Sequence, residues 1–303
     1  MQIGLPAEAD DLEAAASAFV ELRPRLFGIA YRMLGSATEA EDVVQEVWLR
    51  WQATDRSVVE NPPAFLALIA TRLSINLARS APVRREAYVG PWLPDPIDTS
   101  LDPTVGAERG EALELAFLLL LERLTPAQRA AYVLREAFDY PYPQIAEILR
   151  LSTANVRQLV SRARKHLTAV RHEPVDRAEH RRLLAAFLDA ARNGDVAGLE
   201  ALFAADVVST SDGNGLRGAA RFPVPGRNRV ARFMAAFAPR FWQGVEPDWV
   251  ELNGRPAVLV PRGRHGRALL TIDASPEGIH QLLWVVSPDK IETFERSRTR
   301  TGR

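Results

Sequence analysis

The sequence contains no cysteine among its 303 residues, so disulfide bonds and thiolate metal ligands are both excluded. It also contains no long apolar run. The longest, Leu115 to Leu121, is much shorter than the roughly 20 residues that cross a bilayer. The N-terminal segment is acidic and lacks the basic start and apolar stretch of a secretory signal. These absences predict a cytoplasmic protein without a membrane partner.

There is no net charge either, because 38 lysines and arginines balance 38 aspartates and glutamates. This balance conceals a local segregation of charge, which is the informative feature. The length suits two or three domains, and the hydrophobic fraction of 47% is that of a folded globular protein. We therefore look for separate acidic and basic surfaces on folded domains.

The first helical block is expected at residues 10–85. Within it, the segment ATEAEDVVQEVWLRW predicts a helix that starts at Thr38, with Glu41 completing a capping box. An apolar stripe marks the face that this helix buries: Val43, Val44, Val47, Trp48 and Trp51. The opposite face is mainly acidic and polar, and it carries Asp42, Gln45, Glu46 and Leu49.

A basic helix is expected next, from Pro62 to Ser80. Four arginines and no acid occur between Pro62 and Arg85. Residues 86–108 are rich in proline and lack periodicity, which is typical of a linker. Within the linker, the segment PWLPDP (91–96) places a tryptophan and a leucine between prolines. This composition suits a stiff segment that docks on another surface, and it suits a rigid spacer equally well.

The second helical block, residues 109–172, ends in a pattern typical of a helix-turn-helix. Thr125 with Gln128 signals one helix start, and Ser152 signals the start of the last helix. That helix has an apolar face of Val156, Leu159, Val160, Ala163 and Leu167. From Thr153 to His172 there are five lysines or arginines and no acid, which suits duplex DNA. A helical bundle with a solvated basic face has the same periodicity.

The character of the sequence changes in the C-terminal region, residues 175–296. Two helical patterns lead into a strand, and short strand-like runs follow beyond Phe241, separated by turns such as Asn253-Gly254. This order predicts an α+β domain with a mostly antiparallel sheet.

Two segments resemble bacterial RNA polymerase sigma factors of the extracytoplasmic-function group. ATEAEDVVQEVWLRW is similar to the most characteristic segment of this group. LTPAQRAAYVLREAFDYPYPQIAEILRLSTANVRQLVSRARKHL is similar to their C-terminal promoter-reading domain. The order of helical block, linker and helical block also matches, from about Glu13 to His172. Arg150 departs from the family, which often has glycine at this position in the turn.

The resemblance implies roles for the residues that match. The acidic face would bind the clamp helices of core RNA polymerase through Asp42, Gln45, Glu46 and Leu49. The basic helix would lie on the −10 promoter element through Arg72, Asn76 and Arg79. The preceding loop, residues 53–61, would capture a flipped base. The last helix would contact the −35 element through Asn155, Arg157, Gln158, Ser161 and Arg162.

The C-terminal region resembles the cone-shaped fold of nuclear transport factor 2 (NTF2), ketosteroid isomerase and SnoaL-type polyketide cyclases. A SigJ-type subgroup of these sigma factors carries such a tail, with a tryptophan–proline linker motif, a glycine-rich loop and an NPDKL motif. The matching segments here are 92–96, 212–216 and 287–291. Asn214 replaces a glycine and is the substitute that best tolerates positive φ. Leu216 replaces a lysine, and Arg217 is the candidate replacement for its charge.

These motifs imply a regulatory contact of the tail with the linker and the sigma domains. The residues expected to make it are Trp92, Leu93, Pro94, Asp212, Gly213, Asn214, Gly215, Arg217, Pro288, Asp289 and Lys290. The expected fold is therefore multidomain. Two all-α sigma domains, the second with a helix-turn-helix, precede an α+β NTF2/SnoaL-like regulatory domain.

No enzyme activity, cofactor or metal is expected. An isomerase of this fold needs a carboxylate base and acidic donors around an oxyanion. No tyrosine follows Tyr142, and His265 and His280 are isolated in the sequence. The expected partners are core RNA polymerase and promoter DNA, and a small ligand in the tail stays open. Two alternatives also stay open: a ligand-sensing DNA-binding repressor, and a SnoaL-like enzyme with a helical targeting module.

Overall fold

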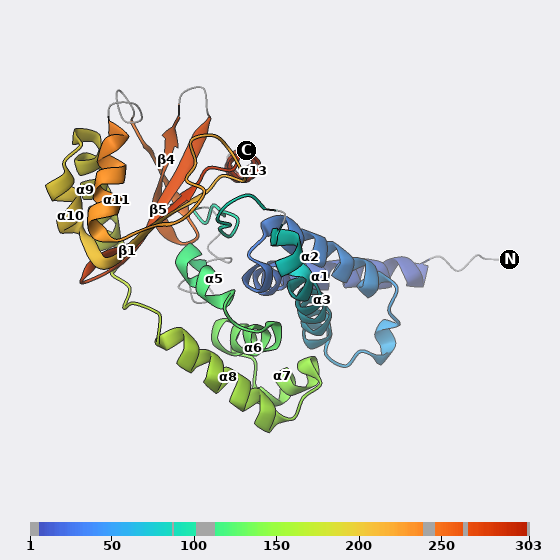
Figure 1. Cartoon of the computed structure of the whole chain (residues 1–303). Helices are drawn as coiled ribbons and strands as arrows, with labels where there is room; N and C mark the ends of the chain where they lie inside the picture. The colour runs from blue at the N-terminus through green and yellow to red at the C-terminus, as the bar shows by residue number, and fades with distance from the viewer. Residues whose placement is uncertain (1–5, 87, 101–112, 239–245, 263–265, 302–303) are drawn as a thin grey trace. The chain divides into compact units, whose positions relative to one another are not determined.

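A computed structural model describes residues 6–86, 88–100, 113–238, 246–262 and 266–301. The expected linker residues 101–108 and His265 therefore lie outside the described residues. The chain divides into two compact units (Figure 1). The helical unit contains the chain up to Pro82 and the stretch Leu121–Ala169. The sheet unit contains the linker from Val83, the start of the second helical block up to Leu120, and the chain from Val170 onward.

The helical unit begins with α1 (Pro6–Leu34), α2 (Ala37–Gln52), a short 3-10 helix (Arg56–Val58) and α3 (Pro62–Glu86). The expected capping box at Thr38 is wrong. The chain turns at Gly35, which has φ +67, and α2 starts directly after it, with the Ser36 side chain accepting the Glu39 N–H. The positive φ of Gly35 ends α1 and brings the next helix start forward by two residues.

The apolar stripe of α2 forms the core against α1, as expected. Val43, Val44 and Val47 are buried, and so is Trp51, whose indole N–H donates to the Ala15 carbonyl at 3.1 Å. Trp48 is only half-buried, and its ring lies 5.0 Å from the ring of Phe19. Packing of this stripe leaves the acidic face of α2 pointing away from α1.

The second block contains α5 (Leu115–Leu121), α6 (Pro126–Tyr132), a π-helical turn (Val133–Ala137), α7 (Tyr142–Leu149) and α8 (Thr153–Thr168). The capping box of Thr125 and Gln128 and the Ser152 cap are both confirmed. Arg150 ends α7 in the left-handed region, with φ +54 and ψ +48. The turn between α7 and α8 thus keeps the backbone conformation that favours glycine, although an arginine occupies it.

A buried arginine and a half-buried one join the two helical blocks within this unit. Arg129 on α6 donates to the Met33 carbonyl at 2.6 Å and to Glu122 at 2.7 Å. Arg25 on α1 donates to the Phe138 carbonyl at 2.7 Å, and its guanidinium lies 4.8 Å from the centre of the Tyr140 ring. These contacts satisfy charges that would be costly to bury alone.

The sheet unit contains α9 (Arg177–Asn193), α10 (Val196–Leu202), β1 (Phe203–Asp212), β2 (Val224–Pro225), α11 (Arg227–Ala236), β3 (Asp248–Leu252), β4 (Arg255–Pro261), β5 (Arg267–Ser275), β6 (Gly278–Val285) and α13 (Pro288–Thr301). The sheet has the order β2-β1-β6-β5-β4-β3. β1 and β6 pair in parallel, and the other pairs are antiparallel, so the expected α+β architecture is confirmed.

Helices α9, α10 and α11 lie on one side of this sheet (Figure 1). The core between them and the strands includes Phe187, Phe203, Val230, Leu270 and Leu282. The parallel pair has a consequence for function. β1 ends at Asp212 beside Val285 at the end of β6, so the chain that follows β6 into α13 starts next to Asp212. Across the described part of the chain, no helix is long and apolar enough to cross a membrane.

The buried His180 predicts a pH dependence of stability. Its Nε2–H donates to the Pro256 carbonyl at 3.0 Å, and burial lowers its pKa to about 4. The unfolded chain, with a pKa near 6.5, binds the proton first as the pH falls. The contribution of His180 is therefore fully present above pH 6.5 and is lost between pH 6.5 and 4. We expect about 3 kcal/mol of unfolding free energy to disappear in this window.

Chemical denaturation at several pH values tests this prediction. His180→Gln keeps an N–H donor near Pro256 and should flatten the slope between pH 6.5 and 4. His166→Gln, at an exposed position on α8, is the matched control and should keep the wild-type slope. An equal slope in His180→Gln and wild type would contradict the assignment.

Candidate functional site

The acidic face of α2 is exposed within the helical unit. Asp42 and Gln45 are exposed, and Leu49 leaves 59% of its surface accessible. Glu46 is half-exposed and pairs with Arg50 one turn later at 2.7 Å. A large apolar side chain among carboxylates is a typical centre for a protein contact, because the leucine gains from burial and the charges steer the partner.

The three residues expected on the −10 element differ in environment. Asn76 and Arg79 are exposed on α3. Arg72 is half-buried, and its guanidinium donates to the carbonyls of Ile148 at 3.1 Å and Glu147 at 3.4 Å. Burial, together with the nearby Arg150, lowers the pKa of Arg72. Arg72 thus binds the C-terminal end of α7, where the helix dipole favours a cation.

The outer face of α8 carries the residues expected on the −35 element. All five are exposed: Asn155, Arg157, Gln158, Ser161 and Arg162. Val156, Val160, Ala163 and Leu167 are buried as expected, and Leu159 is half-buried. The buried set fixes the rotation of α8, so the hydrogen-bonding side chains point outward as a group, as direct reading of base edges requires.

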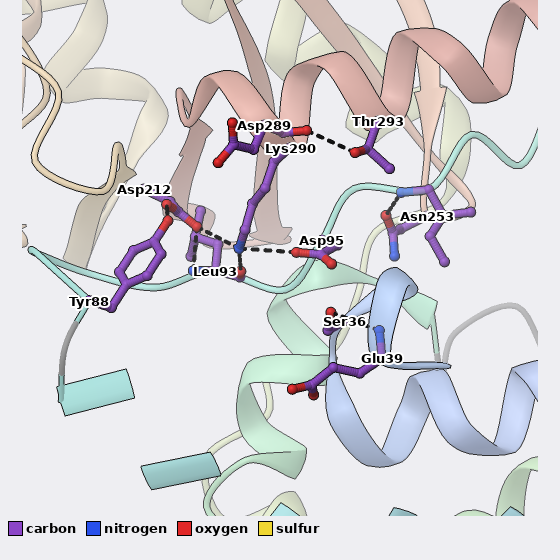
Figure 2. Close-up of polar contacts among 11 residues, drawn as sticks. Ser36, Glu39, Tyr88, Leu93, Asp95, Asp212, Asn253, Asp289, Lys290 and Thr293 are labelled. Atoms are coloured by element: carbon purple, nitrogen blue, oxygen red, sulfur yellow. Dashed lines mark hydrogen bonds and ion pairs between the residues drawn. The ribbon is translucent and has the colours of Figure 1, made fainter. Parts of the chain in front are cut away.

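The linker is bound within the sheet unit at two places. The first place, called here the proximal clasp, consists of Tyr88, Leu93, Asp95, Asp212 and Lys290. Its centre is Asp212, the last residue of β1, which is fully buried. The Asp212 carboxylate accepts hydrogen bonds from the Tyr88 hydroxyl, from the Leu93 N–H at 2.9 Å and from the Lys290 ammonium at 2.9 Å (Figure 2).

Lys290 reaches the same point from α13. Figure 2 shows its side chain extending toward the linker, where its ammonium also contacts the Leu93 carbonyl and pairs with Asp95 at 3.2 Å. The ammonium lies 4.7 Å from the centre of the Trp92 ring, within cation–π range. Burial and the Asp212 carboxylate raise the pKa of the Tyr88 hydroxyl, so this hydroxyl keeps its proton and acts as a donor. One cation and one buried carboxylate therefore bind several points of the linker.

The glycine-rich loop after β1 contacts the linker through its backbone. The Gly215 N–H donates to the Val89 carbonyl at 3.0 Å, and the Val89 N–H donates to the Asn214 side chain at 3.4 Å. Asn214 has φ +43 and Gly215 has φ +80. A Cβ on Gly215 would meet the Val89 side chain at 3.3 Å, so the close approach also favours glycine.

The other expected tail residues lie around this contact. Pro94 is buried in the linker, while Pro288 and Asp289 are exposed at the start of α13. Gly213 approaches Ala219 so closely that a Cβ would clash. Leu216 packs against the apolar core of the sheet unit. Arg217 is exposed, and its role as a replacement for the family's lysine stays a prediction.

Sequence reasoning missed the second place, called here the distal clasp, which is centred on Asn253. This residue sits fully buried in the β3–β4 turn with φ +53. Its N–H donates to the Ile97 carbonyl and its Oδ1 accepts the Ile97 N–H, both at 2.9 Å. Its Nδ2 donates to the Leu113 carbonyl at 2.8 Å. One side chain therefore binds both ends of the stretch from Ile97 to Leu113.

Two further contacts surround the distal clasp. Thr99 donates to Glu251 at 2.9 Å and accepts the Gly254 N–H at 2.8 Å. Glu114, one residue before α5, pairs with Arg255 at 2.7 Å. Burial raises the pKa of Glu114, and the neighbouring Arg255 opposes this shift. The start of the second helical block is thus fixed to β4.

A sequence signal for Asn253 did exist. Asn-Gly between two strand-like runs indicates a tight turn, but such turns are normally exposed. Only the structure shows that this asparagine is buried under the linker.

Lys290→Met should destabilise the protein strongly. It removes the ammonium that offsets the buried Asp212 carboxylate, and breaking such a pair costs about 3–5 kcal/mol. Arg296→Met, on an exposed face of the same helix with a 3.8 Å pair to Glu292, should cost less than about 0.5 kcal/mol. Urea denaturation measures the free energy of unfolding of both variants, and limited proteolysis of the linker should accelerate only in Lys290→Met.

The double variant Lys290→Met/Asp212→Asn should recover part of the lost stability. Equal costs for the two single variants would overturn the proximal clasp.

Comparison with known proteins identifies the two helical blocks. The profile of Sigma-70 region 2 matches residues 18–82, and that of Sigma-70, region 4 matches residues 114–167. The chain is 39% identical over 236 residues to ECF RNA polymerase sigma factor SigJ of Mycobacterium tuberculosis, covering 76% of this chain and 75% of SigJ. It is 35% identical over 178 residues to probable ECF RNA polymerase sigma factor SigI of the same species, covering 57% of this chain and 61% of SigI.

The likeness extends through the sheet unit. A crystal structure of Mycobacterium tuberculosis extracytoplasmic function sigma factor SigJ superposes with a TM-score of 0.74 at 32% sequence identity. The superposition covers 91% of this chain and 98% of that one. Such coverage includes the SnoaL-like tail as well as both helical blocks.

Proposed function

Because the chain belongs to the ECF sigma factors, which bind core RNA polymerase and promoter DNA, we propose that its sheet unit regulates initiation by setting the reach of the linker. The single observation that carries this proposal is Asn253, which binds Ile97 and Leu113 at the same time. The family expected from the sequence is confirmed by the relatives and by both region profiles.

The helical unit has separate exposed surfaces for core polymerase and for promoter DNA. The α2 face with Leu49 at its centre binds core polymerase, and the acidic residues around it speed the encounter. The α8 face with Arg157 and Gln158 reads the −35 element in the major groove. Asn76 and Arg79 of α3 contact the −10 element. No covalent chemistry is assigned to the chain itself.

Arg72 can contact the −10 element only after it leaves its partners on α7. Its guanidinium is occupied by the α7 carbonyls in this structure, so it reaches a DNA phosphate only after α7 withdraws. The packed helical unit is therefore a closed state, and promoter binding requires that the two helical blocks separate.

The length of the linker sets how far the two helical blocks can separate. The names of the two promoter elements place them about 25 base pairs apart, which is about 85 Å along B-DNA. From the end of α3 to the start of α5 the chain has about 28 residues, which reach about 95 Å when extended. When Asn253 binds both ends, the residues between Ile97 and Leu113 add almost nothing to this reach. The distal clasp thus removes about 55 Å, and its release restores that length.

Arg157→Ala tests the sigma assignment. It should weaken promoter binding by about 1–3 kcal/mol and relax base preference within the −35 element. Lys165→Ala, exposed later on α8, should instead weaken binding to all sequences about equally and reduce the salt dependence. Promoters would be selected from random duplexes with core polymerase present, and run-off transcription would measure both variants. Failure of the wild-type chain to start transcripts while it binds duplex DNA without polymerase would favour a repressor.

Asn253→Asp tests the regulatory proposal with the least disturbance. The aspartate still tolerates the turn and still accepts the Ile97 N–H, but it cannot donate to the Leu113 carbonyl. We expect a broader tolerance for the length of DNA between the two elements. This would be measured as transcription from promoters with the spacer altered in single base pairs. Asn193→Asp, exposed at the end of α9, is the matched control.

The two tests fail in different ways. An unchanged spacer profile in Asn253→Asp, with wild-type transcription intact, would remove the regulatory proposal and leave the sigma assignment standing. Point variants are preferable to deletion of the tail, because deletion would expose the buried linker residues Leu93 and Pro94.

A further inference from the structure

Three side chains from distant parts of the sequence meet in the sheet unit. His172 comes from the segment between α8 and α9, Asp206 from β1 and His280 from β6. His280 Nδ1 lies 2.7 Å from one Asp206 oxygen, and His172 Nε2 lies 3.6 Å from the other. The two imidazole rings stack with their centres 3.4 Å apart. His280, isolated in the sequence, thus belongs to a cluster.

We propose that His172, Asp206 and His280 form a binding site for a zinc ion. All three donor atoms lie within 4.8 Å of one another. Ligand atoms about 2.0–2.2 Å from a tetrahedral zinc ion are separated by roughly 3.4 Å, close to the 3.6 Å between His172 and Asp206. The ion replaces the His280–Asp206 hydrogen bond, which widens by about 0.7 Å to become a ligand pair.

A hydrogen bond behind His280 supports its role as a ligand. Its Nε2 lies 2.8 Å from the Ser275 hydroxyl oxygen, which also accepts the Glu277 N–H at 3.0 Å. When the ion replaces the hydrogen bond to Asp206, the Nε2–H donates to Ser275 and the Nδ1 lone pair is free to bind the ion. Metal-binding histidines are commonly oriented in this way by a partner at the other ring nitrogen.

The burial of the three side chains also suits an ion that enters from solvent. The side chain of His280 is 2% exposed, that of His172 is 33% exposed and that of Asp206 is 61% exposed. His280 is therefore the fixed ligand, and the exposed Asp206 gives the ion access. His172 lies on an irregular segment, and binding the ion requires its ring to tilt out of the stack with His280. Three protein ligands leave the fourth position for water.

The position of His172 gives the site a structural consequence. It follows the end of α8 by four residues, and it precedes α9 of the sheet unit. An ion on His172, Asp206 and His280 would fix the point where the chain leaves the DNA-reading helix to β1 and β6. This inference does not depend on the linker or on the proposed regulation.

Zinc binding to the full chain tests the proposal directly. The protein would be freed of metal with a chelator and titrated with zinc sulfate against a chromophoric indicator. We expect one ion per chain, a dissociation constant at or below about 10 µM, and a Tm rise of about 5 °C at saturating zinc. Cobalt in place of zinc should give the visible absorption of a tetrahedral site.

Variants distinguish zinc bound at this site from zinc bound at other histidines of the chain. Asp206→Asn and His172→Ala change the two more exposed ligands and should weaken zinc binding about 10- to 100-fold and abolish the Tm rise. His166→Ala, on the exposed face of α8, should behave as wild type. The readout is the change in Tm that zinc causes in each variant. A variant whose metal-free Tm is lower than that of wild type is therefore still informative. Wild-type affinity weaker than about 100 µM, or equal affinity in Asp206→Asn, would overturn the proposal.

Discussion

The position of the linker depends on one buried carboxylate. Asp212 has no exposed surface, so its charge loses hydration and must be offset by donors inside the protein. Those donors come from the linker, through Tyr88 and Leu93, and from α13, through Lys290. The Asp212 carbonyl also accepts two N–H groups that follow β6. The linker, the end of β1 and the last helix are therefore interdependent, because removing any one leaves the others with unsatisfied polar groups.

The helical unit uses a different kind of partner for the arginines that join its two helical blocks. Arg25 and Arg72 donate to main-chain carbonyls, and Arg129 divides its donors between a carbonyl and Glu122. A carbonyl offsets a charge less completely than a carboxylate does, and water can replace it when the surfaces part. The contact between the two helical blocks therefore depends mainly on neutral acceptors, whereas the proximal clasp depends on a charged one.

Much of the fold could be predicted because the signals were local. The caps at Thr125 and Ser152 depend on residues three positions apart, and both were found. The cap of α2 was misplaced by two residues because Ser36 and Thr38 are both good caps, and the chain direction after Gly35 decided between them. The linker and loop motifs that contribute to the proximal clasp were also recognised. Lys290, expected from the segment 287–291, supplies the ammonium at Asp212.

The rest depended on contacts across long sequence separations. Nothing near Asn253 indicates that it lies under Ile97 and Leu113, and a turn asparagine is ordinarily exposed. His172, Asp206 and His280 likewise come together only because β1 and β6 are neighbours in parallel. Such pairings are set by sheet topology, which a single sequence specifies only through the sum of its packing interactions.

The parallel neighbours β1 and β6 also impose an order in time. Lys290 follows β6, so it leaves the ribosome about 120 residues after the last residue of α8, or about 10 s later at ordinary rates of synthesis. During that interval both promoter-reading blocks and the whole linker exist, but the ammonium that completes the Asp212 contact does not. In each newly made molecule the proximal clasp is therefore completed only after α13 has been synthesised, later than the Asn253 contacts of the distal clasp.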